Sequence, residues 1–215
     1  MPWDERRPIR AVVFDLDGTL YTSPRFAERI YEVAVARVAS GRGLPPLQAR
    51  RLMEEARQQL EEINDELPTL TLTCQELGVD PRELHRAFEE ELHPEYYIDY
   101  DPVLVALLES LAHVCPMYVY TNNNLYLSRK ILALLGVNNL FAGVFTIELS
   151  WLPKPSPEGV RMVLERVEEP PESILFVGDR EEIDLRVPAR MGCPTLQVQD
   201  VADLLQIHQR LGLIP

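Results

Sequence analysis

Residues 11–20 read Ala-Val-Val-Phe-Asp-Leu-Asp-Gly-Thr-Leu, and this stretch decides the fold. Its first four residues form a short, continuous apolar run, which is typical of a strand buried on both faces of a parallel sheet. Asp15 follows directly and Asp17 comes two positions later, where Gly18-Thr19 allows the chain to turn. The stretch therefore predicts a buried strand that ends in two carboxylates able to meet one ligand.

The rest of the chain alternates between strand patterns and helix patterns. Four further short segments rich in β-forming residues are predicted strands: 117–120, 144–147, 174–177 and 195–198. Helix patterns lie between them, and they begin at Asp101-Pro102, at Leu125 and at Ser156-Pro157. This alternation predicts βαβ units, and hence an α/β fold with a doubly wound, mainly parallel, Rossmann-like sheet.

Residues 22–96 break the alternation because they contain helix patterns only. Their apolar stripes are Tyr31, Ala34, Val35 and Val38, then Leu52, Ala56, Leu60 and Ile63, then Leu84, Phe88 and Leu92 after the cap Asp80-Pro81. We therefore predict a catalytic core of residues 1–21 and 97–215 and a small all-helical cap of residues 22–96. Ligands bind outside the carboxyl ends of parallel strands, so an insertion just after the first strand is expected to act as a lid.

Composition limits the function classes. The chain has 21 basic and 34 acidic residues, a net charge of −13, which repels nucleic acid and anionic lipid alike. Cys74, Cys115 and Cys193 are far apart in the sequence, which suits free thiols in a reducing cytoplasm rather than a disulfide framework or a zinc site. The start of the sequence is charged and lacks a signal-peptide pattern. We expect a cytoplasmic protein with no nucleic-acid or membrane partner.

Polar residues at strand ends point to the site. Asp15, Thr121 and Asp179 each follow a predicted strand, and such ends share one crevice. With Asp17 and Asp184, four carboxylates would gather there, and like charges about 4 Å apart repel by about 4 kcal/mol at an effective dielectric of 20. Such a cluster needs a cation, and oxygen ligands without a His or Cys cluster favour Mg²⁺.

The same region offers donors for a phosphate group. Lys154 lies between Pro153 and Pro155 just before a predicted helix, where it can supply positive charge. The Thr121 hydroxyl and the backbone N–H groups that begin at Asn122 complete the set. Of two neighbouring carboxylates, one can attack as a nucleophile while the other carries the proton.

In order and spacing, these residues resemble the four motifs of the haloacid dehalogenase superfamily. The resemblance covers residues 11–198, and the motifs are Asp15-Leu16-Asp17-Gly18-Thr19-Leu20, Thr121 after an apolar strand, Lys154-Pro155-Ser156-Pro157, and Gly178-Asp179-Arg180 through Asp184. Arg180 stands where many members carry a small hydroxyl residue, and Val187-Pro188 replaces a pair of small residues. The Leu20-Tyr21 pair is similar to the pyrimidine nucleotidase branch.

The resemblance implies a two-step phosphoryl transfer. Asp15 would attack phosphorus and form an aspartyl phosphate, while Asp17 would protonate the leaving oxygen and later activate water. Mg²⁺ would be held by the Asp15 carboxylate, the Asp17 carbonyl and Asp179, with Asp184 ligating through water or orienting Lys154. Dehalogenases of the superfamily lack an acid at the position of Asp17, so a phosphate ester is favoured over a haloacid.

The leading hypothesis is a Mg²⁺-dependent phosphatase that hydrolyses a small phosphorylated metabolite, as a monomer or homodimer. One alternative is a phosphosugar mutase of the β-phosphoglucomutase type, which uses the same motifs but returns the phosphoryl group to a sugar. The other is a binding protein that keeps the scaffold without catalysis, for which the altered fourth motif is the best support.

Overall fold

The structure, a computed structural model, describes residues 8–64 and 67–214; the first seven residues, with the charged start of the sequence, lie outside this range. The chain divides into two compact units, one up to Thr22 and from Ile98 onward, the other from Ser23 to Tyr97. These boundaries lie one residue beyond those that the sequence predicts. The role of the second unit as a lid stays a prediction.

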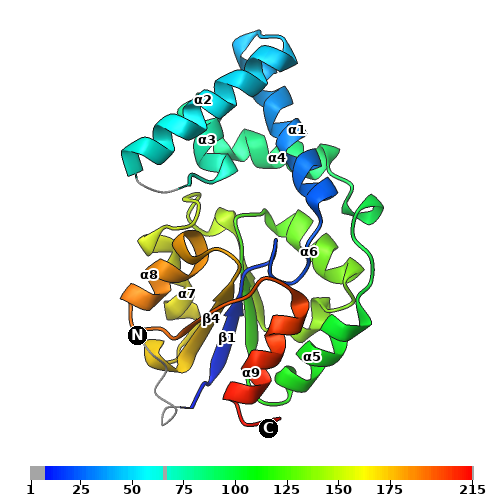
Figure 1. Cartoon of the computed structure of the whole chain (residues 1–215), viewed down its shortest axis with the longest axis vertical. Coiled ribbons are helices and arrows are strands. Elements are labelled where there is room, and N and C mark those ends of the chain that lie inside the picture. The colour runs from blue at the N-terminus through cyan, green and yellow to red at the C-terminus, as the bar shows by residue number, and fades with distance from the viewer. Residues whose placement is uncertain (1–7, 65–66, 215) are drawn as a thin grey trace. The chain divides into compact units, whose positions relative to one another are not determined.

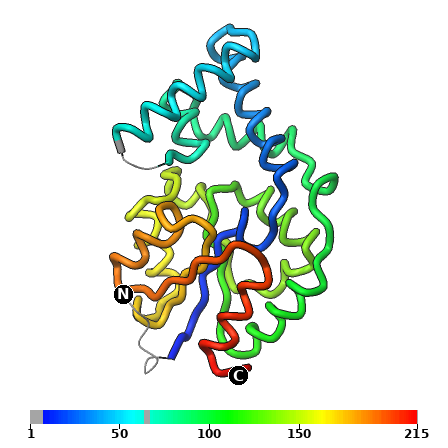
Figure 2. The backbone as a smooth tube through the Cα atoms, viewed as in Figure 1, coloured from blue at the N-terminus to red at the C-terminus, as the bar shows by residue number. Residues whose placement is uncertain are grey.

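The larger unit is built on a parallel sheet of five strands, as predicted. The strands are β1 Ala11–Phe14, β2 Met117–Tyr120, β3 Gly143–Phe145, β4 Ile174–Gly178 and β5 Thr195–Gln197. Their order is β3-β2-β1-β4-β5 and every pairing is parallel. Figure 2 shows β1, at the start of the chain, between segments that come more than 100 residues later. Thus β1 is central, with β2 and β4 on either side.

The third strand ends earlier than the sequence predicts. Residues 144–147 were expected to form it, but the strand stops at Phe145 and a 3-10 helix, η3 Ile147–Leu149, follows. The Phe145 carbonyl accepts from the N–H of Thr121 at 2.9 Å. The next hydrogen bond between these two segments runs from the N–H of Ile147 to the carbonyl of Asn123, which lies beyond the end of β2. The apolar run therefore continues into a turn that packs on the loop after β2.

Helices cover both faces of this sheet. They are α5 Pro102–Ala112, α6 Leu125–Leu134, α7 Pro157–Val167, α8 Arg186–Arg190 and α9 Leu205–Arg210. In Figure 1, α7 and α8 lie on one side of β1 and β4, and α5 and α9 lie on the other. The face toward α7 buries Ala11, Val13 and Phe176 in one cluster with Val160 and Val163. The doubly wound α/β prediction is confirmed.

Side chains cap the predicted helix starts. The Asp101 carboxylate accepts from the N–H groups of Val103 and Leu104, and the Ser156 hydroxyl accepts from Gly159 N–H at 3.2 Å. These bonds satisfy backbone donors that have no partner inside the helix. The cap at Ser156, two residues after Lys154, fixes the start of α7.

The unit from Ser23 to Tyr97 contains helices only, among the residues that the structure describes. They are α1 Pro24–Arg42, α2 Pro46–Asn64, α3 Leu70–Glu76, α4 Pro81–Glu91 and the short η1 Pro94–Tyr96. The predicted stripe of α1 is buried at Ala34, Val35 and Val38, whereas Ile63, near the end of α2, is 78% exposed. Helix α3 has no counterpart in the sequence prediction, because its Thr-Leu-Thr-Leu alternation lacks a helical period.

Candidate active site

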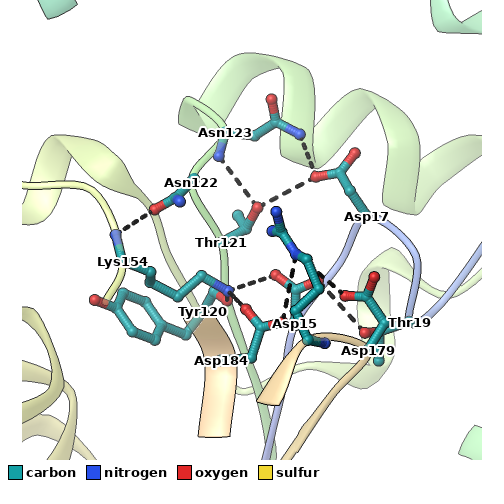
Figure 3. A network of polar contacts seen from close by, with 11 residues as sticks. Asp15, Asp17, Thr19, Tyr120, Thr121, Asn122, Asn123, Lys154, Asp179 and Asp184 are labelled. Atoms are coloured by element: carbon teal, nitrogen blue, oxygen red, sulfur yellow. Dashed lines mark hydrogen bonds and ion pairs between the residues drawn. The ribbon is translucent and has the colours of Figure 1, made fainter. Parts of the chain in front are cut away.

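Three adjacent strands deliver the predicted site residues to one edge of the sheet. Because β1 pairs with both β2 and β4, the residues just after them, Asp15, Thr121 and Asp179, lie side by side. Asp15 and Thr121 are buried and Asp179 is partly buried. Figure 3 shows these side chains with Asp17, Lys154 and Asp184 in one polar network. Asp15, Thr121 and Asp179 therefore meet at one edge of the sheet, as their positions after the predicted strands indicate.

A tight turn after β1 brings the first and fourth motifs into contact. Gly18 has a φ of +92°, and a Cβ at this position would lie 2.5 Å from Asp179 Oδ2. Its N–H donates to the Tyr21 carbonyl at 2.9 Å, which closes the turn. Only glycine combines this backbone angle with such a close approach, so the carboxylate of Asp179 packs directly on the backbone of the first motif.

Lys154 joins the two ends of the carboxylate cluster. Its Nζ donates to Asp15 Oδ1 at 2.5 Å, to Asp184 Oδ1 at 2.6 Å and to the Tyr120 carbonyl at 3.0 Å. The side chain is 3% exposed. The Asn122 side chain accepts from the backbone N–H of Lys154 at 2.7 Å, so it fixes the loop that carries the lysine. The predicted role of the Asn122 backbone N–H as a phosphate donor stays a prediction.

Burial sets the proton affinities of this network. It raises the pKa of Asp15 to about 7, although the Lys154 ammonium opposes the shift. Burial alone would lower the pKa of Lys154, but the carboxylates of Asp15 and Asp184 outweigh it and raise that pKa. For Asp184, burial would raise the pKa, but the positive charges of Lys154 and Arg180 hold that pKa below its ordinary value. Lys154 is therefore a permanent cation, and the cluster still carries an excess of carboxylates.

The carboxylates of Asp15, Asp179 and Asp184 form a group suited to a metal ion, with one oxygen from each within 4.8 Å of the others. Asp179 Oδ1 is buried and accepts no hydrogen bond from the described residues; the nearest cation is Arg180, whose Nε lies 3.8 Å away. A buried carboxylate oxygen without a hydrogen bond is costly unless a cation compensates it. The donor set is all oxygen, which fits Mg²⁺.

Asp17 lies in a different environment from the other three carboxylates. Its Oδ2 accepts from Asn123 Nδ2 at 2.6 Å and from the Thr121 hydroxyl at 3.4 Å, and its Oδ1 accepts from the Tyr21 hydroxyl. Burial raises the pKa of Asp17, and the hydrogen bond from Tyr21 opposes the shift. The side chain of Asp17 stands outside the metal-suited group, so a metal contact through its backbone carbonyl stays a prediction.

Sequence reasoning missed two of these partners. Only the backbone N–H groups were considered in the segment that contains Asn123, and Tyr21 was used only as a mark of one branch of the superfamily. Both residues are close in sequence to a motif residue, Tyr21 four positions after Asp17 and Asn123 two after Thr121. The signal that could have identified them is a polar side chain a few positions after a motif residue, because a tight turn between the two can bring them into contact.

Comparison with known proteins gives the class that this site defines. The haloacid dehalogenase-like hydrolase family model matches residues 9–192. The chain is 26% identical over 196 residues to the glyceraldehyde 3-phosphate phosphatase of Methanopyrus kandleri, a match that covers 89% of this chain and 84% of that protein. The chain therefore belongs to the haloacid dehalogenase-like hydrolase family, and it is a hydrolase.

Solved structures agree with this assignment at the level of the fold. A haloacid dehalogenase-type (HAD) phosphatase from Thermococcus onnurineus matches with a TM-score of 0.61 and 20% identity, over 95% of this chain and 98% of that chain. The HAD-hydrolase YfnB from Bacillus subtilis, bound to magnesium, matches with a TM-score of 0.59 and 18% identity, over 96% and 100%. Within the described residues, none of the helices has the length and apolar character needed to span a bilayer.

Proposed function

We propose that this hydrolase is a Mg²⁺-dependent phosphatase that cleaves a small phosphate monoester through an aspartyl-phosphate intermediate. The observation that carries the proposal is the position of Asp15, which is 5% exposed, paired with Lys154 and grouped with Asp179 and Asp184 as a metal-suited set. The phosphatase relative and the magnesium-bound structural neighbour support it. A small phosphorylated metabolite, such as a triose phosphate, is the substrate class that the relative favours.

The residues of the site divide the reaction between them. A carboxylate oxygen of Asp15 forms a bond to phosphorus, and the bond from phosphorus to the ester oxygen breaks with its electron pair on that oxygen. Asp17, which burial helps to keep protonated, gives its proton to the leaving oxygen. Water deprotonated by Asp17 then attacks phosphorus, so that phosphate leaves and Asp15 is restored.

Cations offset the negative charge of this reaction. Lys154 supplies one fixed positive charge beside Asp15, and Thr121 supplies a neutral donor at the end of β2. Asp15, Asp179 and Asp184 are the side chains that would hold Mg²⁺, which when bound neutralises charge on the transferring phosphoryl group. Without such cations, the acidic cluster would repel a phosphate dianion.

Release of inorganic phosphate from p-nitrophenyl phosphate and glyceraldehyde 3-phosphate tests the proposal. Turnover should require Mg²⁺ and stop on addition of EDTA. Asp15→Asn should lower kcat by at least about 10⁴-fold with the fold retained, because it removes the nucleophile. The matched control is Asp99→Asn, the same change at an exposed position, which should keep full activity.

Two results would contradict the proposal. An Asp15→Asn variant that keeps most of the activity would remove the nucleophile assignment. Formation of an isomeric phosphate ester with little free phosphate would make the protein a mutase instead.

We further propose a cytoplasmic location, which the free, buried cysteines favour, and a protein that acts as a monomer or homodimer without nucleic-acid or membrane partners.

A further inference from the structure

The turn after β1 returns the chain to Asp17. Residues Asp17 and Tyr21 form an isolated parallel bridge, and the backbone bond from Gly18 N–H to the Tyr21 carbonyl holds the turn closed. The Tyr21 hydroxyl donates to Asp17 Oδ1, and the Tyr21 side chain is 9% exposed. A buried phenol whose hydroxyl meets the carboxylate of the first motif is more specific than packing alone requires.

The two oxygens of Asp17 have chemically different partners. Asn123 Nδ2 can only donate, so Oδ2, at 2.6 Å from it, is held as an acceptor. The Tyr21 hydroxyl donates to the other oxygen, Oδ1. With one neutral donor on each oxygen, the pair of contacts fixes the plane of the carboxyl group.

We propose that Tyr21 is a positioning residue that, with Asn123, orients the Asp17 carboxyl group for proton transfer to the leaving oxygen. This inference rests on the proposed phosphatase function. When the ester bond breaks, its electron pair stays on the leaving oxygen, which takes the proton from Asp17, so an alcohol and the aspartyl phosphate of Asp15 result. Asp17 becomes a carboxylate, and the donors from Tyr21 and Asn123 stabilise that product.

The demand for this proton depends on the substrate. The alkoxide released from glycerol 3-phosphate is strongly basic and needs a proton as it leaves, whereas 2,4-dinitrophenolate is a stable anion and needs none. A residue that only maintains the fold affects both substrates equally. A residue that orients the proton donor affects mainly the alkyl ester, and kcat/KM reports this difference because it covers the steps up to departure of the alcohol.

The test compares Tyr21→Phe with the wild type on these two esters. Proton transfer by a positioned side chain contributes about 10²- to 10⁴-fold, so kcat/KM for glycerol 3-phosphate should fall by about 10- to 100-fold. The value for 2,4-dinitrophenyl phosphate should fall by less than about threefold. The matched control, Tyr118→Phe, removes a hydroxyl on β2 from a ring that stacks on Phe145, and it should change neither value.

Each remaining outcome has one reading. Equal losses on both esters, or no loss on either, would overturn the positioning role and leave the phosphatase proposal intact. A wild type that hydrolyses neither ester would overturn the phosphatase proposal, and this inference with it. Thermal unfolding of Tyr21→Phe serves as a check on the fold, since a variant that is folded at the assay temperature and still loses activity on both esters counts against the inference.

Discussion

Replacement of Lys154 by methionine removes the cation that holds the carboxylate cluster together. The lysine is 3% exposed and lies 2.5 Å from Asp15 and 2.6 Å from Asp184. At an effective dielectric of 20, each attraction is worth about 6 kcal/mol. Burial of the three charges costs several kcal/mol per ion, so most of that attraction is offset. Removal of one buried partner typically costs about 3 to 5 kcal/mol, and we expect a loss of this size for Lys154→Met in the absence of metal.

Urea unfolding followed by tryptophan fluorescence measures this loss in the larger unit, because both tryptophans of the sequence lie outside residues 23–97. Lys130→Met is the matched control, since Lys130 is the only other lysine and lies on α6, away from the strand ends. Mg²⁺ should raise the midpoint of Lys154→Met more than that of the wild type, because the variant has more uncompensated negative charge. A loss below about 1 kcal/mol without metal would refute the argument that Lys154 balances buried carboxylates.

Two other changes test the structure independently of catalysis. Gly18→Ala and Gly192→Ala introduce a side chain at nearly the same φ, +92° and +91°, so the backbone angle alone should cost both about 1 to 2 kcal/mol of stability, and the contact with Asp179 should add to the loss in Gly18→Ala. Only Gly18→Ala should weaken Mg²⁺ binding in calorimetric titration, because its Cβ displaces the Asp179 carboxylate; equal binding by both variants would argue against a metal at Asp179. Burial lowers the pKa of His85 to about 4 from 6.5, so its unfolded form binds a proton first and stability should fall by up to about 3 kcal/mol as pH drops from 6.5 to 4. His85→Gln should remove this pH dependence, the exposed His113→Gln should retain it, and an unchanged slope in His85→Gln would show that other groups cause it.

The position of the site residues was predictable from the sequence, because the carboxyl ends of neighbouring parallel strands lie at the same edge of a sheet. Short apolar runs gave the strands, and the polar residue after each run, such as Asp15, Thr121 or Asp179, had to reach the same edge of the sheet. The sequence could not give the length of β3, since Thr146 and Ile147 are as β-prone as the strand itself. The neighbouring strand sets the length of β3. Because β2 ends at Tyr120, which pairs with Phe145, it offers no further residue with which β3 could pair.

The contacts around Asp17 were beyond sequence reasoning for a different reason. Motif order shows which residues share a site, but it does not show which oxygen meets which donor. The hydroxyl of Tyr21 reaches Asp17 only because the turn at Gly18 brings residues four apart into a bridge. Asn123 reaches it from another strand end, 106 positions later in the chain. Both contacts depend on backbone geometry that composition and periodicity do not encode.

The surroundings of Asp15 and Asp17 explain how two carboxylates two residues apart can have separate roles. Asp15 accepts from the ammonium group of Lys154 and belongs to the metal-suited group, so every cation added to the site favours its ionised, nucleophilic form. Asp17 accepts only from the neutral donors Tyr21, Asn123 and Thr121 among the hydrogen bonds of its side chain. Neutral donors tolerate a proton on the carboxyl group, whereas an ammonium group at 2.5 Å opposes it. We therefore expect metal binding to lower the pKa of Asp15 more than that of Asp17, which favours an ionised nucleophile beside a protonated donor.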